Sequence, residues 1–331
     1  MEKKNIVLLC GGGFSEHDIS LVSAAFLKDQ LSSLKTYNLF FVEITKEGQW
    51  IHEETGPCEI GLDGKLKLLK ENKEVPIDYT IPCLHGPPGE NGDIQSFFEL
   101  ANISYLGAGP EASQNCFNKI STKLWFNAHS IPNTPFVFLK NSSKKQVELA
   151  QEAFDQWGSV YVKASSQGSS IGCYFVKDKK DLESKIKEAF KLSPYVLLEK
   201  PIVGRELEIS VYEWEGKLIA TDPAEIETPS SSFYSFEEKY SQDSKTETHI
   251  KARNINDEIK KKMKETALKA FTLLKIKDLA RVDFFLSKDK EIYINEINTF
   301  PGMTPISLFP KMMEANGHSF SKFLKQKIDG R

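Results

Sequence analysis

Short apolar runs alternate with stretches of helical periodicity along the first hundred residues. Apolar runs at 5–10, 37–44 and 77–84 predict strands, and a helix is expected from about Ser20. The last of these strands is followed by a Gly/Pro loop and a further helical stretch. Such alternation is typical of a doubly wound parallel sheet, so we expect an N-terminal α/β domain of this class over residues 1–107.

A second unit begins after residue 107, where a helical stretch at 111–129 is followed by a break with two prolines. Three strands are predicted in the rest of this unit, at 160–163, 172–176 and 195–199. Two lobes therefore emerge from the pattern, and we expect the second to cover residues 108–201.

The C-terminal part of the chain, residues 202–331, has a different order of elements. Strands come first, then a serine-rich and charged segment at 228–251, then a long amphipathic helix to about Lys275 and a closing pair of strands. The segment at 228–251 is too long for a simple turn, and its aromatic residues favour an ordered lid: Phe233, Tyr234, Phe236 and Tyr240. The C-terminal half is therefore expected to be α+β.

Composition narrows the class of protein. A chain of 331 residues with 40% hydrophobic and 27% charged residues is an ordinary globular protein of two or three domains. A net charge of -3 gives no electrostatic footprint for nucleic acid, so a small molecule is the expected partner. The first apolar run is too short for a signal peptide or a membrane span, which predicts a cytoplasmic protein. The cysteines lack Cys-x-x-Cys spacing and are expected to be reduced and buried: Cys10, Cys58, Cys83, Cys116 and Cys173.

The closing strand pair carries the clearest chemical signal. Because side chains alternate between the faces of a strand, Arg281 shares a face with Asp283, and Glu296 shares one with Asn298. The short Ser-Lys-Asp-Lys turn folds the second strand back on the first. Asp283, Glu296 and Asn298 offer only oxygen ligands, which suits magnesium rather than zinc. A magnesium-nucleotide site is one interpretation, and solvated turn carboxylates are the alternative.

Two further segments have the chemistry of a nucleotide site. The loop at 163–172, Lys-Ala-Ser-Ser-Gln-Gly-Ser-Ser-Ile-Gly, can offer backbone N–H groups and the Lys163 ammonium to phosphates, although it also fits a surface turn. It is not a P-loop, since Gly-x-x-x-x-Gly-Lys-Ser/Thr does not occur in the chain. The strand that ends in Glu199, before Pro201, can bind the edge of an adenine ring, and Glu206 can accept hydrogen bonds from ribose hydroxyls. The alternative interpretation of this segment is a polar turn between strands.

Two Gly-rich loops follow strands in the N-terminal part. The first, from Gly11, precedes a helix but departs from the dinucleotide fingerprint, because Glu16 stands where the third glycine would be. A carboxylate there would repel a pyrophosphate and suits a ligand ammonium. The second begins at His85, and a lone histidine at such a place is more often structural.

The ordered set of motifs resembles the D-alanine-D-alanine ligases of the ATP-grasp superfamily over almost the entire chain. The resemblance rests on six stretches, which begin at Gly11, Leu84, Lys163, Gly204, Phe233 and Arg281. It implies a Rossmann-like N-terminal domain over 1–107 and a two-lobed ATP-grasp fold over 108–201 and 202–331. ATP would be clasped between these two lobes under a lid at 228–251.

The resemblance also implies a role for individual residues. ATP would be contacted by Lys119, Lys163, Ser170, Glu199, Lys200, Ile202, Glu206 and Lys239. Two magnesium ions, for which manganese could substitute, would be held by Asp283, Glu296 and Asn298. The amino acids would be bound by Glu16, His85, Arg281, Gly302, Ser307 and Leu308. The catalytic set would be Glu16, Ser169, Tyr240, Arg281 and Gly302.

The implied reaction joins two D-alanines for peptidoglycan synthesis. The first carboxylate attacks the γ-phosphate of ATP, and the amine of the second D-alanine attacks the resulting acyl phosphate, which releases ADP and phosphate. Arg281 and the Gly302 N–H would stabilise the oxyanion, while Glu16, Ser169 and Tyr240 would pin the lid over the site. The resemblance further implies a homodimer, without a nucleic-acid or membrane partner.

Four positions depart from the common pattern of that family: Phe14, Asn91, Ala164 and Gln167. None removes a group with an implied catalytic role. Within enzymes, the alternatives are another ATP-grasp carboxylate-amine ligase and a depsipeptide-forming variant, although the Lys239-Tyr240 pair resembles the dipeptide-forming ligases. Outside this class, a catalytically idle ATP-binding regulator and a dinucleotide-dependent oxidoreductase are the other two readings.

Overall fold

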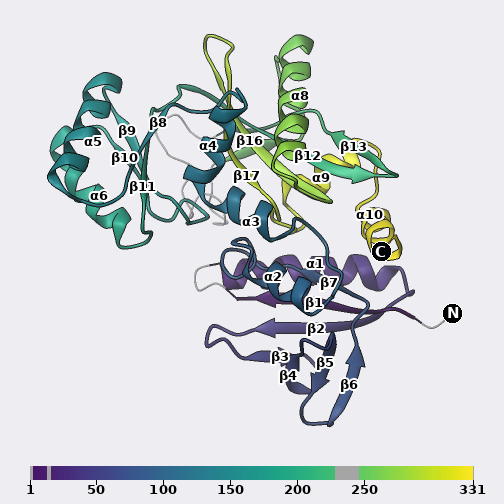
Figure 1. The fold of residues 1–331 in the computed structure, drawn as a ribbon. Helices are drawn as coiled ribbons and strands as arrows, with labels where there is room; N and C mark the ends of the chain where they lie inside the picture. Colours follow the sequence, from purple (N-terminus) through teal and green to yellow (C-terminus); the bar gives the residue numbers. More distant parts are fainter. Residues whose placement is uncertain (1–2, 13–15, 228–245, 331) are drawn as a thin grey trace.

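Three β-sheets organise the chain, and helices pack on each of them (Figure 1). The computed structural model describes residues 3–12, 16–227 and 246–330. The fold is mixed α/β, as the apolar pattern predicted. In Figure 1 the N-terminal sheet lies at the bottom, the middle sheet at the upper left, and the C-terminal sheet at the upper centre and right.

The N-terminal sheet has the order β6-β5-β4-β3-β2-β1-β7 and is only partly parallel. Strand β1 (Asn5–Gly11) runs parallel to β2 (Asn38–Ile44) and to β7 (Tyr79–Pro82). The prediction of a wholly parallel sheet is wrong for the outer strands, which are antiparallel because their short connections leave no room for a crossover: β3 (Trp50–His52), β4 (Gly56–Ile60), β5 (Lys65–Leu68) and β6 (Lys73–Pro76). Its helices are α1 (His17–Ser33) and α2 (Asp93–Leu100).

The middle sheet is antiparallel throughout, with the order β10-β9-β11-β8. Three of its strands lie close to the predicted positions: β9 (Val160–Ala164), β10 (Cys173–Val176) and β11 (Val196–Glu199). The fourth strand, β8 (Phe136–Leu139), was not predicted. The elements that accompany it are α5 (Lys144–Trp157), the short 3-10 helix η1 (Lys179–Asp181) and α6 (Leu182–Phe190).

The helical stretch predicted at 111–129 is two helices, α3 (Pro110–Phe117) and α4 (Lys119–Ala128). Asn118 breaks it, because its backbone is extended and its side chain accepts hydrogen bonds from the N–H groups of Ile120 and Ser121. An N-cap of this kind starts a new helix. It places Lys119 in the first turn of α4.

The C-terminal sheet has the order β15-β14-β12-β16-β17, and β13 pairs separately with β12. The strands are β12 (Gly204–Trp214), β13 (Lys217–Ala220), β14 (Ala224–Glu227), β15 (Glu247–His249), β16 (Leu279–Ser287) and β17 (Ile292–Asn298). The helices are α8 (Asp257–Leu273), α9 (Leu308–Ala315) and α10 (Phe320–Asp329). Strand β15 lies inside the segment predicted to form a lid, of which residues 228–245 are outside the described part of the chain.

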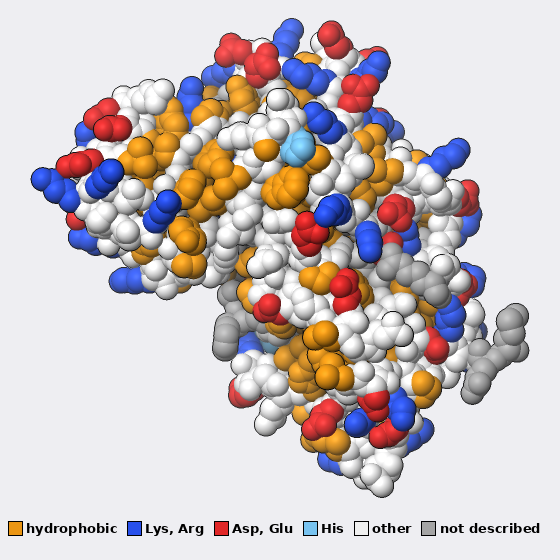
Figure 2. Space-filling view, in the orientation of Figure 1, with side chains coloured by type: hydrophobic (Ala, Val, Ile, Leu, Met, Phe, Trp, Pro, Cys, Tyr) orange, Lys and Arg blue, Asp and Glu red, His pale blue; other side chains and the backbone are white. Residues whose placement is uncertain are grey.

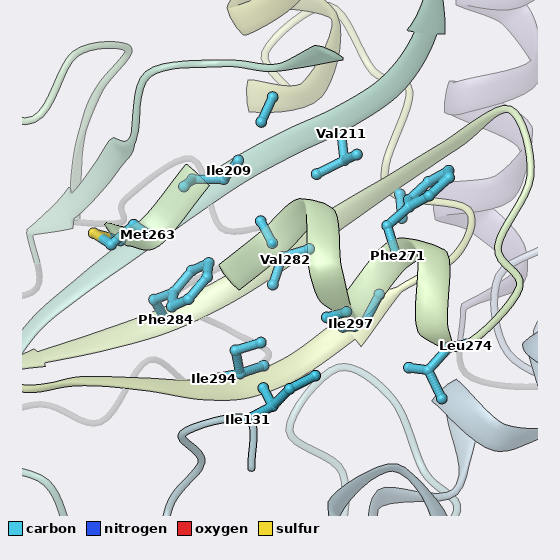
Figure 3. Packing of buried hydrophobic residues seen from close by; sticks show 14 of the residues in the cluster. Ile131, Ile209, Val211, Met263, Phe271, Leu274, Val282, Phe284, Ile294 and Ile297 are labelled. Atoms are coloured by element: carbon cyan, nitrogen blue, oxygen red, sulfur yellow. The ribbon is translucent and has the colours of Figure 1, made fainter. Parts of the chain in front are cut away.

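Helix α8 closes one face of this sheet (Figure 3). Its apolar positions recur at helical spacing, so that Met263, Phe271 and Leu274 face the sheet together. They belong to one buried cluster with Ile209 of β12 and Val282 of β16. Each fully buried side chain of this size contributes roughly 1.5–3 kcal/mol to folding. This core fixes β16 and β17, which carry much of the candidate site.

A second core joins the N-terminal sheet to the C-terminal part of the chain. Ile6 of β1 shares a buried cluster with Tyr212 of β12 and Phe323 of α10. Helix α10 packs beside α1 (Figure 1), and the Lys4 ammonium donates to the Ile328 carbonyl at 2.7 Å. The division into 1–107, 108–201 and 202–331 stays a prediction, and this core ties its first and third parts.

The surface and the thiols agree with the expectations from composition. Figure 2 shows basic and acidic side chains interspersed over the visible face, without a large region of one sign. Among the described residues, no helix combines the length and the apolar character needed to cross a membrane. All five cysteines are unpaired, as predicted, and four of them are buried. The prediction of burial is wrong for Cys173, which is only partly buried because it lies on the edge strand of the middle sheet, at the cleft.

Candidate active site

Strands β16 and β17 form the antiparallel pair that the sequence predicted. Asp283 lies opposite Glu296, and Arg281 lies opposite Asn298. A register shift next to Asp283 makes β17 bulge, so that two successive residues, Asn295 and Glu296, are both partly exposed instead of alternating. A bulge re-aims side chains locally, and here it turns both residues toward one cleft.

The cleft lies between the middle and C-terminal sheets and collects most of the residues predicted to contact ATP. Strands β9 and β11, the loop after β9 and the β16/β17 pair supply its walls. The predicted residues that line it are Lys119, Lys163, Ser169, Ser170, Glu199, Lys200, Ile202, Glu206 and Glu296. The structure therefore brings together groups that are far apart in the sequence.

A buried cluster of three charges lies at one wall of this cleft. The Lys163 ammonium is 2.5 Å from one Glu199 carboxylate oxygen, and the Lys123 ammonium is 2.8 Å from the other. The Thr134 hydroxyl donates to Glu199 at 3.2 Å, and the Lys163 ammonium also donates to the side-chain oxygen Oδ1 of Asn295 at 3.4 Å. Burial by itself raises the pKa of Glu199, but the two ammonium groups lower that pKa to about 2. Glu199 is therefore a firmly ionised carboxylate.

Lys119 connects three elements at the next part of the cleft. From the first turn of α4, its ammonium donates to the Gln167 carbonyl at 2.7 Å and lies 3.4 Å from a Glu296 carboxylate oxygen. The loop that it contacts contains Ser169 and Ser170, whose φ values of 48° and 62° are in the left-handed region. Side chains rarely adopt this conformation, and successive turns of this type present backbone N–H groups to anions.

The Ser169 hydroxyl links this loop to the N-terminal domain by donating a hydrogen bond to Glu16. Glu16 directly precedes α1 and is 7% exposed. A side chain at Gly86 would place its first carbon 2.8 Å from the Glu16 carboxylate, and Gly86 has a φ of +67°, so only glycine fits there. The nucleotide-type cleft and the Glu16 region are thus parts of one site.

Glu90 lies in the same region and has the opposite electrostatic environment to Glu199. Its carboxylate accepts a hydrogen bond from the Gly86 N–H at 3.0 Å. Burial, followed by repulsion from the Glu16 carboxylate, raises the pKa of Glu90 to about 8. Two carboxyl groups in one partly buried place are suited to receive a cation.

Arg281 is the nearby cation on the C-terminal sheet. Its guanidinium makes two hydrogen bonds to Asp283, at 2.7 and 2.8 Å, and its Nε lies 3.2 Å from Glu208 on β12. Burial lowers the pKa of the guanidinium, but the carboxylates of Asp283 and Glu208 outweigh it and raise that pKa. His85 is buried close to this charge, and burial together with Arg281 lowers the pKa of His85 to about 4. The imidazole is therefore neutral near pH 7.

The segment after β17 carries the remaining predicted residues. Gly302 precedes a turn in which the Thr304 N–H donates to the Ser307 hydroxyl at 3.0 Å, and Leu308 begins α9. The Met303 N–H points to the Ser23 hydroxyl of α1 at 3.4 Å. Tyr240 and Lys239 lie outside the described residues.

Ser23, Lys123, Asn295 and Glu208 contact the predicted residues, but the sequence did not single them out. The Ser23 hydroxyl lies 3.1 Å from Nε2 of His85 as well as near the Met303 N–H. Lys123 follows Lys119 by one helical turn, and this spacing was its only signal in the sequence. Each of these four residues contacts a partner on an element that is distant in the sequence.

Two of the four departures from the family pattern form local hydrogen bonds. The Asn91 amide donates to Asp93 at 2.6 Å, and the Gln167 amide donates to the Leu192 carbonyl at 2.9 Å. Ala164 is buried at the end of β9, and Phe14 lies outside the described residues. The amides at 91 and 167 thus both have hydrogen-bond partners within the described residues.

Lysines, a loop with left-handed serines and carboxylates in register have the chemistry that nucleotide phosphates require. They lie between two antiparallel sheets, which is the arrangement of ATP-grasp enzymes and defines the class of this protein. Comparison with known proteins makes the class specific: residues 5–108 match the model of the D-ala D-ala ligase N-terminus, and residues 125–329 match that of the D-ala D-ala ligase C-terminus. The chain belongs to the D-alanine-D-alanine ligase family, and it is an enzyme, a ligase of the ADP-forming class.

Relatives and solved structures agree with this assignment over the full length. The chain is 49% identical over 330 residues to a D-alanine-D-alanine ligase of Shewanella pealeana and 50% identical over 325 residues to one of Vibrio atlanticus, and each match covers 98% or more of both proteins. The structure of D-alanyl-alanine synthetase A from Vibrio cholerae O1 biovar eltor superposes with a TM-score of 0.94 at 47% identity and covers 100% of this chain and 98% of that one. A D-Ala:D-Ser ligase from Enterococcus faecalis superposes with a TM-score of 0.86 at 28% identity, with 99% of each chain covered.

Proposed function

We propose that the protein joins two molecules of D-alanine to D-alanyl-D-alanine through a D-alanyl phosphate, with release of ADP and phosphate. The contact of Ser169 with Glu16 carries the proposal, because it links the loop suited to phosphates with a carboxylate suited to an amino-acid ammonium. The product would enter peptidoglycan synthesis in the cytoplasm. We further propose a homodimer as the assembly.

ATP would lie in the cleft between the middle and C-terminal sheets. Adenine would meet Glu199, the backbone of Lys200 and Ile202, and the ribose hydroxyls would donate to Glu206. The phosphates would lie against Lys119, Lys163 and the Ser170 loop, with Lys239 as a further contact from the segment outside the described residues. All of these except Lys239 line the cleft. The lysines and backbone N–H groups would then stabilise charge on the transferred phosphoryl group.

The residues near the phosphates fit magnesium. Asp283, Glu296 and Asn298 offer oxygen ligands only, and the first two lie opposite each other in the β16/β17 register. Two ions, either magnesium or manganese, would be held there and would neutralise phosphoryl charge when bound. Arg281 binds Asp283 and Lys119 lies beside Glu296, so cationic side chains also contact these carboxylates.

The amino acids would lie where the N-terminal domain meets β16 and the segment after β17. Glu16 would bind the first ammonium, with His85 beside the substrate as a neutral hydrogen-bonding group. The first carboxylate attacks the γ-phosphorus, and the bond from phosphorus to the bridging oxygen of ADP breaks. The second amine then attacks the acyl carbon, and phosphate leaves as the amine loses a proton.

The charged groups around the acyl carbon would act by positioning and electrostatics. Arg281 and the Gly302 N–H would stabilise the tetrahedral oxyanion. Ser307 and the Leu308 N–H, at the start of α9, would bind the second carboxylate, which a helix N-terminus favours. Tyr240 would complete a hydrogen-bonded group with Glu16 and Ser169 that holds the lid over the reactive acyl phosphate.

A related second function is ligation of D-alanine to D-serine or D-lactate. The superposition on the Enterococcus faecalis D-Ala:D-Ser ligase favours it, since such a fold accommodates another second substrate. The Lys239-Tyr240 pair favours the dipeptide product. Substrate tests separate the two functions.

The test is magnesium- and ATP-dependent phosphate release with D-alanine alone, L-alanine alone, and D-alanine with D-serine or D-lactate. We expect phosphate and D-alanyl-D-alanine, identified by mass, with the D-enantiomer only. Asp283→Ala should abolish product formation, because it removes a metal ligand. A mixed product would replace the substrate assignment, and the absence of phosphate release in all mixtures would overturn the proposed function.

A further inference from the structure

Lys123 is a buried ammonium that lies behind the nucleotide cleft. It is 1% exposed, and its ammonium contacts the Thr134 hydroxyl, a Glu199 oxygen at 2.8 Å and the face of the Phe136 ring at 5.7 Å from the centroid. Within the described residues, Glu199 and Lys163 line the cleft and Lys123 does not. Lys123 can therefore act on a bound nucleotide through its two partners that line the cleft, Glu199 and Thr134.

Stability does not account for a lysine at this position. Burial of an ammonium costs several kcal/mol, and a buried ion pair is often no more stabilising than apolar side chains of the same volume. Methionine has nearly the length of the lysine side chain without its charge. The contribution of Lys123 is therefore better sought in what the ion pair does to Glu199.

The two lysines that share Glu199 differ in access to the ligand. Lys163 lines the cleft and also reaches Asn295 at 3.4 Å, so it can turn toward phosphate when a nucleotide binds. Lys123 has no such route, because helix α4 and Thr134 enclose it. When Lys163 turns to the phosphates, Lys123 remains as the counter-charge of Glu199.

We propose that Lys123 is a positioning residue that holds the Glu199 carboxylate toward the 6-amino group of adenine and thereby sets the base specificity of the site. The inference rests on the proposed nucleotide site. A carboxylate accepts a hydrogen bond from the 6-amino group of ATP, whereas the 6-oxo group of inosine triphosphate presents an acceptor to another acceptor. Without Lys123, Glu199 stays with Lys163 or takes up a proton, and the distinction between the two bases is lost.

The experiment measures the Kd of ATP and of inosine triphosphate by calorimetry, with magnesium and without amino acid, for the wild-type enzyme and for Lys123→Met. A hydrogen bond to a charged group is worth about 1.5–3 kcal/mol, so we expect the preference for ATP to fall roughly 10-fold to 100-fold. The loss should come from weaker ATP binding. An unchanged preference in a folded Lys123→Met protein, or a wild-type enzyme without any preference for ATP, overturns the proposal.

A double-mutant cycle asks whether Lys123 acts through Glu199. Glu199→Gln removes the charge and lets the amide face either base, so it should lose the preference by itself. If the lysine acts only through this carboxylate, Lys123→Met adds no further loss to Glu199→Gln. Additive losses in the cycle would show that Lys123 acts elsewhere and would contradict the proposal.

Further variants test the proposal if Lys123→Met folds poorly. Thr134→Val removes the hydroxyl that bonds both Lys123 and Glu199. Because the direct contact of Lys123 with Glu199 stays in place, this variant should lower the ATP preference less, by about 3-fold to 10-fold. An unchanged preference there also counts against the proposal. Lys185→Met, which breaks the surface pair with Glu188, is the matched control and should leave the preference unchanged. Because nucleotide binding is measured without D-alanine, a failure to form dipeptide overturns the proposed function and leaves this test standing.

Discussion

Two glutamates at opposite ends of the same site have opposite electrostatic environments. Glu199 lies between the ammonium groups of Lys123 and Lys163, and its pKa falls to about 2 despite burial. Glu90 is partly buried and lies near Glu16, and its pKa rises to about 8. The proposed nucleotide end thus places two ammonium groups around one carboxylate, whereas the proposed amino-acid end places the carboxyl groups of Glu16 and Glu90 near each other.

This difference explains what each end can receive. Two lysines around one carboxylate leave net positive charge for phosphates, and paired carboxyl groups leave a place for an ammonium. Arg281 lies between the two ends and holds Asp283 and Glu208. The comparison therefore predicts that changes at Arg281 affect both ends, and that changes at Glu90, His85 or Ser23 affect the amino-acid end.

The largest effect is expected for Arg281→Met. It removes the counter-charge of two buried carboxylates, which should lower the free energy of unfolding by about 3–5 kcal/mol. It also removes a proposed oxyanion donor, which should lower kcat by roughly 100-fold to 1000-fold. Urea unfolding and the rate of D-alanyl-D-alanine formation measure the two effects.

Arg205→Met is the matched control for that change. Arg205 makes two hydrogen bonds to Glu225 on the same sheet, at 2.6 and 2.7 Å, but does not line the cleft. It should lose stability with little change in kcat. Equal losses of kcat in the two variants would show that Arg281 acts only through the fold.

The chemistry of the β16/β17 pair was accessible from sequence because it depends on local rules. Alternation along a strand and a short turn suffice to place Arg281 and Asp283 opposite Asn298 and Glu296. The bulge at Asn295 was not accessible, since it exists only in the pairing of the two strands. The outer antiparallel strands of the first sheet were missed because each is short and buries few side chains: β4, for example, buries only Cys58.

The next effect is a loss of stability on acidification through His85. The pKa of His85 is about 4 in the folded protein against 6.5 in the unfolded chain, so the unfolded chain binds the proton more tightly between these values. The stabilising contribution is present above pH 6.5 and is lost as the pH falls toward 4, by about 3 kcal/mol. The free energies of unfolding of the wild-type protein and of His85→Gln, measured from pH 7 to pH 4, should approach each other by this amount. Parallel curves would mean that His85 is protonated without cost.

Glu90 should make the free energy of unfolding fall as the pH rises, which is the opposite of the dependence expected for His85. Its pKa is raised from 4.5 to about 8 on folding, so its protonated form stabilises the fold below pH 4.5 and this contribution is lost as the pH rises to 8. Since the residue is only partly buried, we expect about 2 kcal/mol relative to Glu90→Gln. Urea unfolding of the two proteins between pH 4.5 and pH 9 measures the difference.

Ligand binding sharpens the same comparison. The ammonium of D-alanine should lower the pKa of Glu90, so binding at pH 7 in the presence of a non-hydrolysable ATP analogue should release protons. Calorimetry in two buffers of different ionisation enthalpy detects this release. Glu90→Gln should abolish it, and proton release that persists in the variant would place the titrating group elsewhere.

Neither of these shifts was accessible from the sequence. Glu16 and Glu90 are brought together by loops of the N-terminal domain, and His85 meets Arg281 across the boundary between the first and third parts of the chain. A pKa depends on burial and on neighbours in space, and neither is defined before the fold. For the same reason the role of Lys123 could not be predicted, because its partner Glu199 belongs to another element.

The smallest effect is expected for Ser23→Ala. The Ser23 hydroxyl lies within reach of both the His85 ring and the Met303 N–H, so it ties α1 to a residue of the amino-acid end and to the segment that carries Gly302. Loss of one such hydrogen bond is worth about 1 kcal/mol, which corresponds to a rise of roughly 5-fold in the KM for D-alanine. The KM for ATP should stay unchanged, because the nucleotide end has its own contacts. Ser20→Ala, one turn earlier on α1, removes a hydroxyl that bonds Gly11 and Cys83 instead, and it should not separate the two KM values. If Ser23→Ala raised both KM values equally, the two ends would not be independent, and the contrast between them would have to be given up.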